Sequence, residues 1–483
     1  MRVESHLNWM LLGACFLVHT QPTSCLSTWA RKTLEQALHG VDPEKRHEQL
    51  EHLAEMYFGK KIKTIRRPSP PKPNKFDENS TESIVGGEMG IEEINIKEGV
   101  AEYLFQGDIN LTEEQMRWIE SGITAGNTTR QKRQVDRGAR RWTNNRLFYF
   151  FDGSVDTKKR EIVKEALNFI RARTCLEFTE SSTAANRVRV FSGAGCFATI
   201  GMAGGVQELS LGSGCDLVGI AAHEFAHALG VWHTQMRDDR DSFVRVDLSA
   251  VPPGMLHNYI KLPASRIINY TPYEYGSYMH YDSRSFATRG DSIIPLDSSY
   301  LRTLGSRLIS FYDIKMLNDH YNCQASCSTG AAVCFNQGVP NPRRCAVCNC
   351  PSGYSGALCN QRPTGCGETL TATDRWQTKQ FTFGDATIRV VRSTQAECHH
   401  WITAPTGKRI QIQVTALQNS QCHNGCTLNA IEPKTLSDRA LTNPRICCPD
   451  SLNRVLTSNL NPTPIISYNR FFTSTFTFQY RFV

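Results

Sequence analysis

The stretch His-Glu-Phe-Ala-His-Ala-Leu-Gly-Val-Trp-His, which begins at His223, constrains the fold more than any other part of the chain. In a helix, His223 and His227 leave the same face and can share one metal ion. Gly230 lacks a Cβ and can adopt the left-handed conformation that ends a helix, so the chain can turn back and bring His233 to the same ion. Three protein ligands and one open position are typical of a catalytic zinc. The pKa of its bound water is about 7, and Glu224 is placed to take the proton.

A second motif decides between this interpretation and an ordinary amphipathic helix, which a bare HExxH pattern also allows. The glycine and the third histidine match the metzincin pattern, which requires a later methionine turn. That turn is present as Ser277-Tyr-Met-His-Tyr281. Together with Arg237-Asp-Asp-Arg-Asp241, it resembles the astacin family of metzincin zinc peptidases.

The resemblance implies an α+β, two-lobed catalytic domain over residues 134–323. It also implies roles for individual residues: zinc ligands His223, His227 and His233, the general base Glu224, the apolar floor Met279, and Tyr281 as a further zinc ligand that swings away to stabilise the oxyanion. One position departs from the family pattern, because Thr234 stands where relatives have a glutamate that pairs with the new amino terminus.

The residues before this domain divide into two parts. Residues 1–24 contain the apolar run Trp9–Val18, which is too short to span a bilayer and predicts a secretory signal. Residues 25–133 resemble a propeptide: Ser27–Tyr57 has periodic leucines and predicts a helical segment, and Arg66–Asn79 is rich in proline and predicts a loop.

Two motifs predict latency and its release. Phe105-Gln-Gly-Asp108 reads on its own as a strand that ends in a turn, but it also resembles the astacin propeptide motif whose aspartate ligates the zinc. Carboxylate is an acceptable zinc ligand, so Asp108 would keep the precursor inactive. Arg130-Gln-Lys-Arg133 resembles a site for a furin-like activating protease, which would leave Gln134 as the first residue, although Arg140-Arg141 offers a second cut.

Within the catalytic domain, alternation predicts strands at 145–151, 188–191 and 197–202, and helical spacing predicts a helix over Thr157–Arg173. The segment Gly201–Leu211 resembles the astacin edge strand, to which an extended substrate would add as a further strand.

Cysteines divide the rest of the chain. Of 18 cysteines, 16 lie after residue 170, an even number that predicts eight disulfides in an oxidising compartment. Residues 324–360 resemble an EGF-like module and residues 366–483 resemble a CUB β-sandwich, with half-buried strands expected at 409–414 and 476–482. The resemblances imply six pairs: Cys175–Cys323, Cys196–Cys215, Cys327–Cys345, Cys334–Cys348, Cys350–Cys359 and Cys366–Cys398. The pairing of Cys422, Cys426, Cys447 and Cys448 stays open.

Charge and sequons add smaller constraints. The formal net charge of +8 is spread along the chain without a dense basic block in the mature region, so a nucleic-acid partner is not expected. No later stretch predicts a membrane anchor. Sequons predict glycosylation at Asn79, Asn110, Asn127 and Asn269, of which only Asn269 would remain after activation.

Two functional hypotheses follow. The first is a secreted zinc endopeptidase, made as a zymogen, that cleaves extracellular matrix or cuticle proteins, collagens among them. The second is a catalytically silent matrix-binding protein that acts through its EGF-like and CUB modules. The presence of Glu224 and all three histidines favours the enzyme. Arg307 lies where astacins build the pocket for an acidic residue after the scissile bond, although a surface arginine is the alternative.

Overall fold

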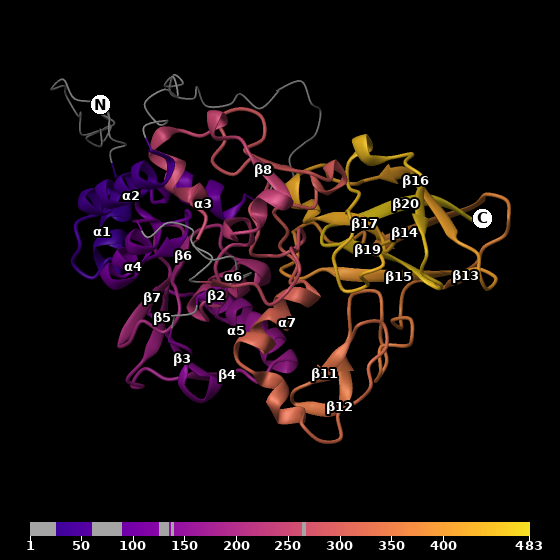
Figure 1. The fold of residues 1–483 in the computed structure, drawn as a ribbon, viewed down its shortest axis with the longest axis horizontal. Helices are drawn as coiled ribbons and strands as arrows, with labels where there is room; N and C mark the ends of the chain where they lie inside the picture. The colour runs from indigo at the N-terminus through magenta and orange to yellow at the C-terminus, as the bar shows by residue number, and fades with distance from the viewer. Residues whose placement is uncertain (1–25, 60–88, 125–134, 137–139, 263–266) are drawn as a thin grey trace, which may run out of the picture.

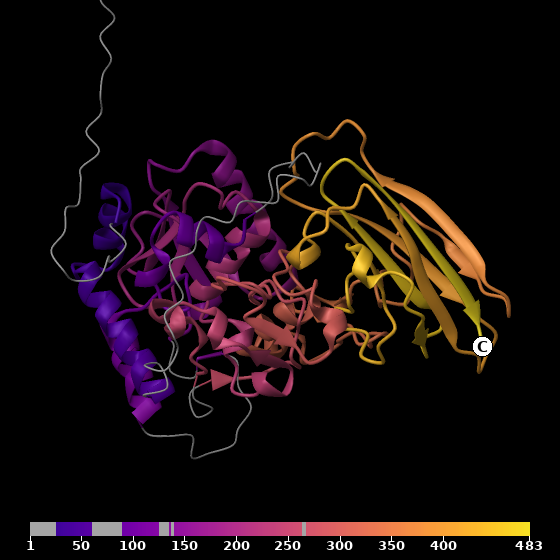
Figure 2. The ribbon, with the colours of Figure 1, turned by 90° about the horizontal axis from the view of Figure 1, so that it is seen from above.

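A computed structural model describes residues 26–59, 89–124, 135–136, 140–262 and 267–483. We refer to four parts: the amino-terminal segment (described residues between 26 and 124), the central domain (140–323), the cystine-rich module (324–360) and the C-terminal sandwich (366–483). The amino-terminal segment and the sandwich lie on opposite sides of the central domain (Figures 1 and 2). The predicted signal, the loop at 66–79 and the cleavage site at Arg133–Gln134 lie outside the described residues.

The amino-terminal segment consists of helices and one short strand: α1 (Thr28–Ala37), α2 (Pro43–Phe58), α3 (Ile91–Lys97), β1 (Ile109–Asn110) and α4 (Glu113–Thr124). The helical segment predicted at 27–57 is confirmed as two helices. The break falls at Gly40, whose φ is +87°. Asp42 then caps α2 by accepting from the amides of Glu44 and Lys45.

The first half of the central domain contains most of a six-stranded sheet, in the order β1-β6-β7-β5-β3-β4. Its own strands are β3 (Arg146–Phe151), β4 (Glu177–Glu180), β5 (Arg187–Phe191), β6 (Cys196–Thr199) and β7 (Val206–Leu211). The predicted strands at 145–151, 188–191 and 197–202 are confirmed within three residues at each end. Helix α5 (Thr157–Arg173) has the predicted bounds, begins at the N-cap Asp156 and packs its apolar face in the core shared with α6 (Val218–Ala228).

The prediction that the segment Gly201–Leu211 forms an edge strand is wrong. β7, in the segment 201–211, lies inside the sheet between β6 and β5, whereas β6 carries the edge on which β1 pairs in parallel. The prediction comes from the resemblance of this segment to an edge strand, and the local sequence describes which face of a strand is buried and not which strand lies outermost.

The second half of the central domain contains little regular structure. Its elements are the pair β8 (Val244–Val246) and β10 (Ile293–Pro295), strand β9 (Ile267–Ile268), the 3₁₀ turn η7 (Pro253–Tyr259), and helix α7 (Phe311–His320). β9 pairs with β2 (Val135–Asp136), which lies before the domain. The cystine-rich module follows with the hairpin β11 (Val339–Asn341) and β12 (Arg344–Asn349).

The C-terminal sandwich packs two four-stranded sheets face to face, β13-β15-β19-β17 on β14-β20-β16-β18. The strands are β13 (Thr369–Thr371), β14 (Gln377–Gly384), β15 (Ala396–Thr403), β16 (Ile410–Gln418), β17 (Asn429–Pro433), β18 (Leu456–Ser458), β19 (Thr463–Asn469) and β20 (Thr473–Phe482). The predicted strands at 409–414 and 476–482 are confirmed, and their alternate residues, such as Ile412 and Phe478, fill the core.

Eight disulfides link the 16 cysteines after residue 170. Six are the pairs that the resemblances imply. The remaining four cysteines form Cys422–Cys448 and Cys426–Cys447. In the part of the chain that the structure describes, no helix has both the length and the apolar character that a membrane span requires.

Candidate metal centre

Helix α6 holds the first two histidines in the core of the central domain. Every residue of α6 is buried, including His223 and His227. The helix ends at Gly230, whose φ is +94° and whose amide donates to the carbonyl of His227. The chain then turns back and places His233 beside the other two rings, as the sequence predicts.

Four buried side chains converge at one point: Asp108, His223, His227 and His233, whose ligand atoms all lie within 4.8 Å of one another. Asp108 Oδ2 lies 3.1 Å from the Nε2 atoms of both His223 and His233, and its Oδ1 lies 3.4 Å from Nε2 of His227. Ligands about 2.0–2.1 Å from a tetrahedral zinc are separated from one another by about 3.3 Å. The cluster therefore has the dimensions of a zinc site.

The hydrogen bonds of the three rings fix which nitrogen carries the proton. Each Nδ1 faces an oxygen: the Tyr278 carbonyl at 2.7 Å from His223, the Val231 carbonyl at 2.8 Å from His227, and Gln106 Oε1 at 2.9 Å from His233. Because these oxygens can only accept, each Nδ1 donates and a neutral ring presents a lone pair at Nε2.

Burial favours the neutral form of two of these rings. It lowers the pKa of His223, and it lowers the pKa of His233 to about 3. Three Nε2 lone pairs and the Asp108 carboxylate thus face one another with no proton to share, and only a cation satisfies such a set of acceptors. The residues fit a zinc ion.

Glu224 lies next to the first ligand but outside the cluster. Its side chain is fully buried, and neither carboxylate oxygen has a hydrogen-bond partner among the described residues. Burial, reinforced by the charges of Asp108 and Glu92, raises its pKa well above the usual range. Such a carboxyl group is suited to take up a proton.

The methionine turn orients His223. The Tyr278 carbonyl accepts from His223, Met279 is fully buried, and its amide donates to Ser277 Oγ at 3.0 Å. Ser277 Oγ in turn donates to Asp313 Oδ1 at 2.6 Å. Sequence reasoning missed Asp313. Its place three residues after Ser310 is a capping-box pattern that predicts the start of α7, but nothing local indicates its contact with the turn.

The amino-terminal segment also reaches Tyr281, and it contacts His233 a second time. The hydroxyl of Tyr281 donates to the Gln106 carbonyl, and the side chain of Gln106 accepts from His233. In this form of the chain, Tyr281 is thus bonded to the segment that carries Asp108. Sequence reasoning did not single out Gln106.

Two other predicted positions lie close by. Arg307 is half-buried near Glu92 of the amino-terminal segment, where burial raises the pKa of Glu92 to about 7 and Arg307 opposes that rise. The side chain of Thr234 is fully buried, and its hydroxyl has no partner among the described residues. The roles proposed for Arg307 and Thr234 stay predictions.

One predicted glycosylation site conflicts with the fold. Asn110 is buried in β1, and its Nδ2 donates to the Ala37 carbonyl at 2.7 Å, so a glycan on that nitrogen does not fit. Asn269 is half-buried and its Nδ2 donates to Asp238, and glycosylation there stays a prediction. Asn79 and Asn127 lie outside the described residues.

Comparisons with known proteins agree with the chemistry of this centre. A family model described as Astacin, a peptidase family, matches residues 134–322. The chain is 44% identical over 453 residues to zinc metalloproteinase nas-32 of Caenorhabditis elegans, covering 92% of this chain and 68% of that protein. It is 37% identical over 403 residues to zinc metalloproteinase nas-31 of the same organism, covering 81% of this chain and 66% of that protein.

Among solved structures, one similar chain is high choriolytic enzyme 1, a hatching enzyme zinc-protease from Oryzias latipes (medaka fish). The identity is 32%, the match covers 38% of this chain and 94% of that chain, and the TM-score is 0.35.

Proposed function

The chain belongs to the astacin family of zinc metalloendopeptidases, and from that premise we propose that it is a secreted, latent precursor whose activated form cleaves extracellular proteins. The observation that carries the proposal is the position of Asp108, a residue of the amino-terminal segment, against the Nε2 atoms of all three histidines. A carboxylate bound there takes the coordination position that a peptidase needs for water.

In the activated form, Glu224 and Tyr281 take part in peptide hydrolysis beside the metal. When bound, zinc supplies a water of lowered pKa and polarises the substrate carbonyl. Glu224 takes the proton, since its carboxylate is buried beside His223 and outside the ligand set. Tyr281 is free to turn once the Gln106 carbonyl has left, and its hydroxyl then stabilises the developing oxyanion.

Latency and activation follow from the amino-terminal segment. Residues 25–133 act as the propeptide, with Asp108 as the inhibitory ligand. A furin-like protease would cut after Arg133 and leave Gln134 as the first residue. Support comes from the number of bonds that the segment makes at the centre, since Gln106 contacts both His233 and Tyr281.

The remaining modules fit an extracellular protein. Eight disulfides favour an oxidising compartment. We interpret the cystine-rich module as EGF-like and the C-terminal sandwich as a CUB domain. Matrix or cuticle proteins, collagens among them, are the proposed substrates.

The competing hypothesis is a silent matrix-binding protein. The test compares the activated chain with Glu224→Ala and with Glu165→Ala, an exposed control on α5. We expect Glu224→Ala to lose hydrolysis of a peptide library by about 10²–10⁴-fold at unchanged zinc content, and Glu165→Ala to match the parent. Tyr281→Phe should lower kcat by about 10²-fold with little change in KM. A folded, zinc-loaded parent that cleaves nothing in the library supports the silent protein instead.

A further inference from the structure

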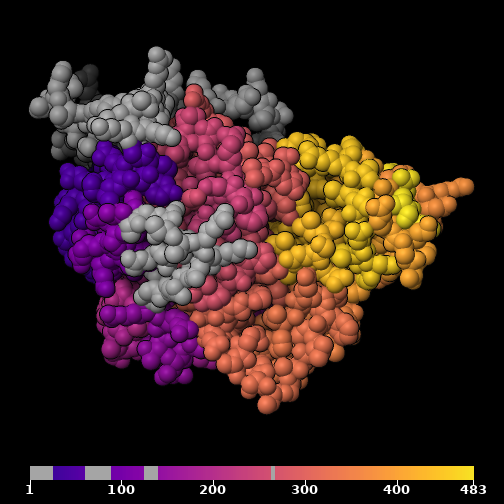
Figure 3. All heavy atoms as spheres, in the orientation of Figure 1, coloured from indigo at the N-terminus to yellow at the C-terminus, as the bar shows by residue number. Residues whose placement is uncertain are grey.

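One of the segments through which the C-terminal sandwich contacts the central domain is the loop Asp438–Arg445. The atoms of the two parts lie directly against each other in Figure 3. The amide of Thr442 donates to Glu274 Oε2 at 3.0 Å, and the Thr442 carbonyl accepts from the hydroxyl of Tyr300 at 3.1 Å. Thr442 and Glu274 are both buried, so these bonds are shielded from water.

Arg445 ends the loop and binds a second part of the central domain. Its amide donates to Thr303 Oγ1 at 2.9 Å, and its Nη1 donates to Ser306 Oγ at 2.7 Å. Behind it, the buried carboxylate of Glu432 holds the guanidinium, with 3.4 Å between Nε and Oε2. The loop is therefore fixed on the sandwich as well as on the central domain.

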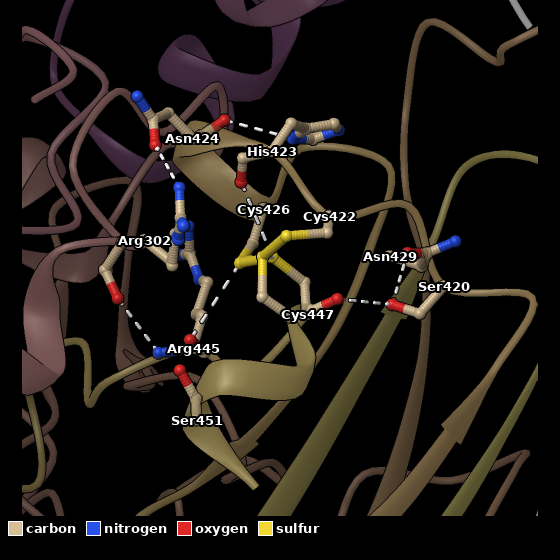
Figure 4. Close-up of a disulfide and its surroundings, with 12 residues drawn as sticks. Arg302, Ser420, Cys422, His423, Asn424, Cys426, Asn429, Arg445, Cys447 and Ser451 are labelled. Atoms are coloured by element: carbon tan, nitrogen blue, oxygen red, sulfur yellow. Dashed lines mark hydrogen bonds between the residues drawn. A yellow bond between two sulfur atoms is a disulfide. The ribbon is translucent and has the colours of Figure 1, made fainter. Parts of the chain in front are cut away.

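Two disulfides brace the same region. Cys422–Cys448 and Cys426–Cys447 close the segment beside the loop (Figure 4). From that segment, Asn424 accepts from Arg302 Nη1 at 3.1 Å and donates to Ser283 Oγ at 3.1 Å. Arg302 and Ser283 belong to the central domain, so the disulfide cluster lies at the interface.

Two of the contacted parts of the central domain, the one around Glu274 and the stretch 303–308, support His223. Glu274 accepts from the Gly276 amide at 2.8 Å, and Gly276 is two residues before Tyr278, whose carbonyl holds the His223 ring. On the other side, the stretch 303–308 packs under α6: a Cβ added at Gly219, one turn before His223, would lie 2.1 Å from the Arg307 carbonyl oxygen.

We propose that the loop Asp438–Arg445 is a positioning element of the metal centre, so that the C-terminal sandwich is a working part of the peptidase and not only a binding module. The inference rests on the peptidase function proposed above. Thr442 holds Glu274 and so the turn whose Tyr278 carbonyl orients His223. Arg445 holds the stretch 303–308, which packs against α6, the helix that carries His223. Loosening the loop should lower kcat more than it raises KM and should let zinc leave faster.

A size exchange across the interface tests this in the full chain. A Cβ added at Gly276 would lie 2.5–2.6 Å from three side-chain atoms of Thr442, and the backbone of Gly276 is one that alanine can adopt. Gly276→Ala should therefore push the loop away. Adding Thr442→Gly removes the atoms that clash, while the bonds made by the Thr442 backbone remain. Gly153→Ala is the matched control, because an added Cβ there meets nothing within 4 Å.

We expect Gly276→Ala to lower kcat and to speed zinc transfer to a chelator, each by about tenfold, and Thr442→Gly in the same chain to restore both. Gly153→Ala should match the parent. The chelator measurement is also made on the uncleaved chain, so it reports on the loop even if no substrate is cleaved. Defects in Gly276→Ala that persist with Thr442→Gly, or no defect at all, would overturn the proposal.

A second substitution guards against a Gly276→Ala chain that fails to fold. Thr303→Val keeps the size of a fully buried side chain and removes the acceptor of the Arg445 amide. It should speed zinc transfer about threefold to tenfold with KM unchanged, as expected for one lost buried hydrogen bond. Zinc transfer at the parental rate in this variant would contradict the role of Arg445.

Discussion

The amino-terminal segment reaches the metal centre directly, through Asp108 and Gln106, whereas the C-terminal sandwich reaches it indirectly, through Glu274 and the methionine turn. The segment also shares three apolar clusters with the central domain. One joins residues such as Phe105 and Ile109 to Trp232, a second joins α1 to Phe197, and a third joins Ile91 and Ile94 of α3 to the core around α5 and α6. The sandwich shares a smaller apolar cluster, around Leu308, and adds hydrogen bonds from the loop Asp438–Arg445 and from Asn424 and an ion pair between Asp450 and Arg302.

This difference gives the two parts different roles. The amino-terminal segment must leave the metal centre before catalysis, whereas the C-terminal sandwich can stay bound to the central domain. The inhibitory contacts of the segment occupy the coordination position that the activated enzyme needs for water and hold the hydroxyl of Tyr281, so they block function while they last. The bonds of the sandwich end on carboxylates and hydroxyls away from the ligand atoms, so they can persist during catalysis. The predictions below test the two interfaces against each other.

The largest effect is expected from removing the ligand on the amino-terminal side. In a chain kept uncleaved by Arg133→Ala, Asp108→Ala should raise peptidase activity by on the order of 10²-fold, because it frees a coordination position. Asp108→Asn keeps the shape and one acceptor oxygen, so its gain should be smaller. Hydrolysis of a peptide library measures both. Equal, parental activity in all three uncleaved chains would show that apolar cover alone maintains latency.

The next effect is a pH dependence of the free energy of unfolding that arises at the amino-terminal interface. His257, in η7, is buried and donates from Nε2 to the Leu104 carbonyl at 3.0 Å. Burial lowers its pKa to about 4, whereas an exposed histidine titrates near 6.5. The unfolded chain therefore binds more protons between these values. The stability that His257 contributes is present above pH ~6.5 and is lost as the pH falls to about 4, by about 3 kcal/mol in total.

His47, on α2, gives the opposite slope at higher pH. Its bond to Glu51, opposed by burial, raises its pKa to about 9, so the stability it contributes is present below pH ~6.5 and is lost as the pH rises through 9. Urea unfolding of the uncleaved chain should show a flatter acid limb in His257→Gln and a flatter alkaline limb in His47→Gln. His423→Gln is the control at the sandwich interface, where burial also lowers the pKa of the ring to about 4. The peptidase activity of the uncleaved chain at pH 5 separates the two interfaces, because His257 bonds to the amino-terminal segment. The comparison fails if His423→Gln changes that activity as much as His257→Gln does.

A smaller effect is expected at the turn that presents Asp108. Gly107 has a φ of +78°, and a Cβ added there would lie 2.4 Å from Phe286 Cζ. Gly99 has a similar φ of +76° but nothing within 4 Å, so it controls for backbone strain alone. Overpacking costs about 1–3 kcal/mol, so Gly107→Ala should raise the activity of the uncleaved chain about tenfold over Gly99→Ala. Equal activity in the two variants would place the turn outside the latency mechanism.

On the sandwich side, one partly buried hydrogen bond should matter less. The Tyr312 hydroxyl donates to Asp438 Oδ2 at 2.7 Å. Tyr312→Phe removes this bond and should cost about 1 kcal/mol, seen as a modest drop in Tm of the full chain. Latency should not change, because Asp438 lies on the side away from Asp108's segment. Increased activity of the uncleaved variant would show that the two interfaces are coupled.

The zinc ligands could be predicted because their spacing is local. His223, His227 and Gly230 lie within eight residues, and their chemistry requires a fixed helical geometry. Contacts between distant residues left no such signal: Gln106 meets His233 across 127 residues, and Glu274 meets Thr442 across 168. The pairing of the last four cysteines was open for the same reason, since four cysteines allow three connectivities and only the fold selects one.

The smallest expected effect concerns the new amino terminus. In relatives, a glutamate after the third histidine pairs with that terminus, and here Thr234 takes its place. Thr234 is buried, its amide donates to the Met279 carbonyl at 2.8 Å, and its side chain offers no charge. A terminal ammonium buried there would lack an anionic partner and would be destabilised by several kcal/mol. Activation should then depend on the departure of Asp108 and not on a new ion pair. Extending the mature chain by one or two residues should change kcat/KM less than about twofold, the change that ±0.5 kcal/mol allows. A large loss on extension that Thr234→Glu restores would instead show that a buried terminus completes the active site.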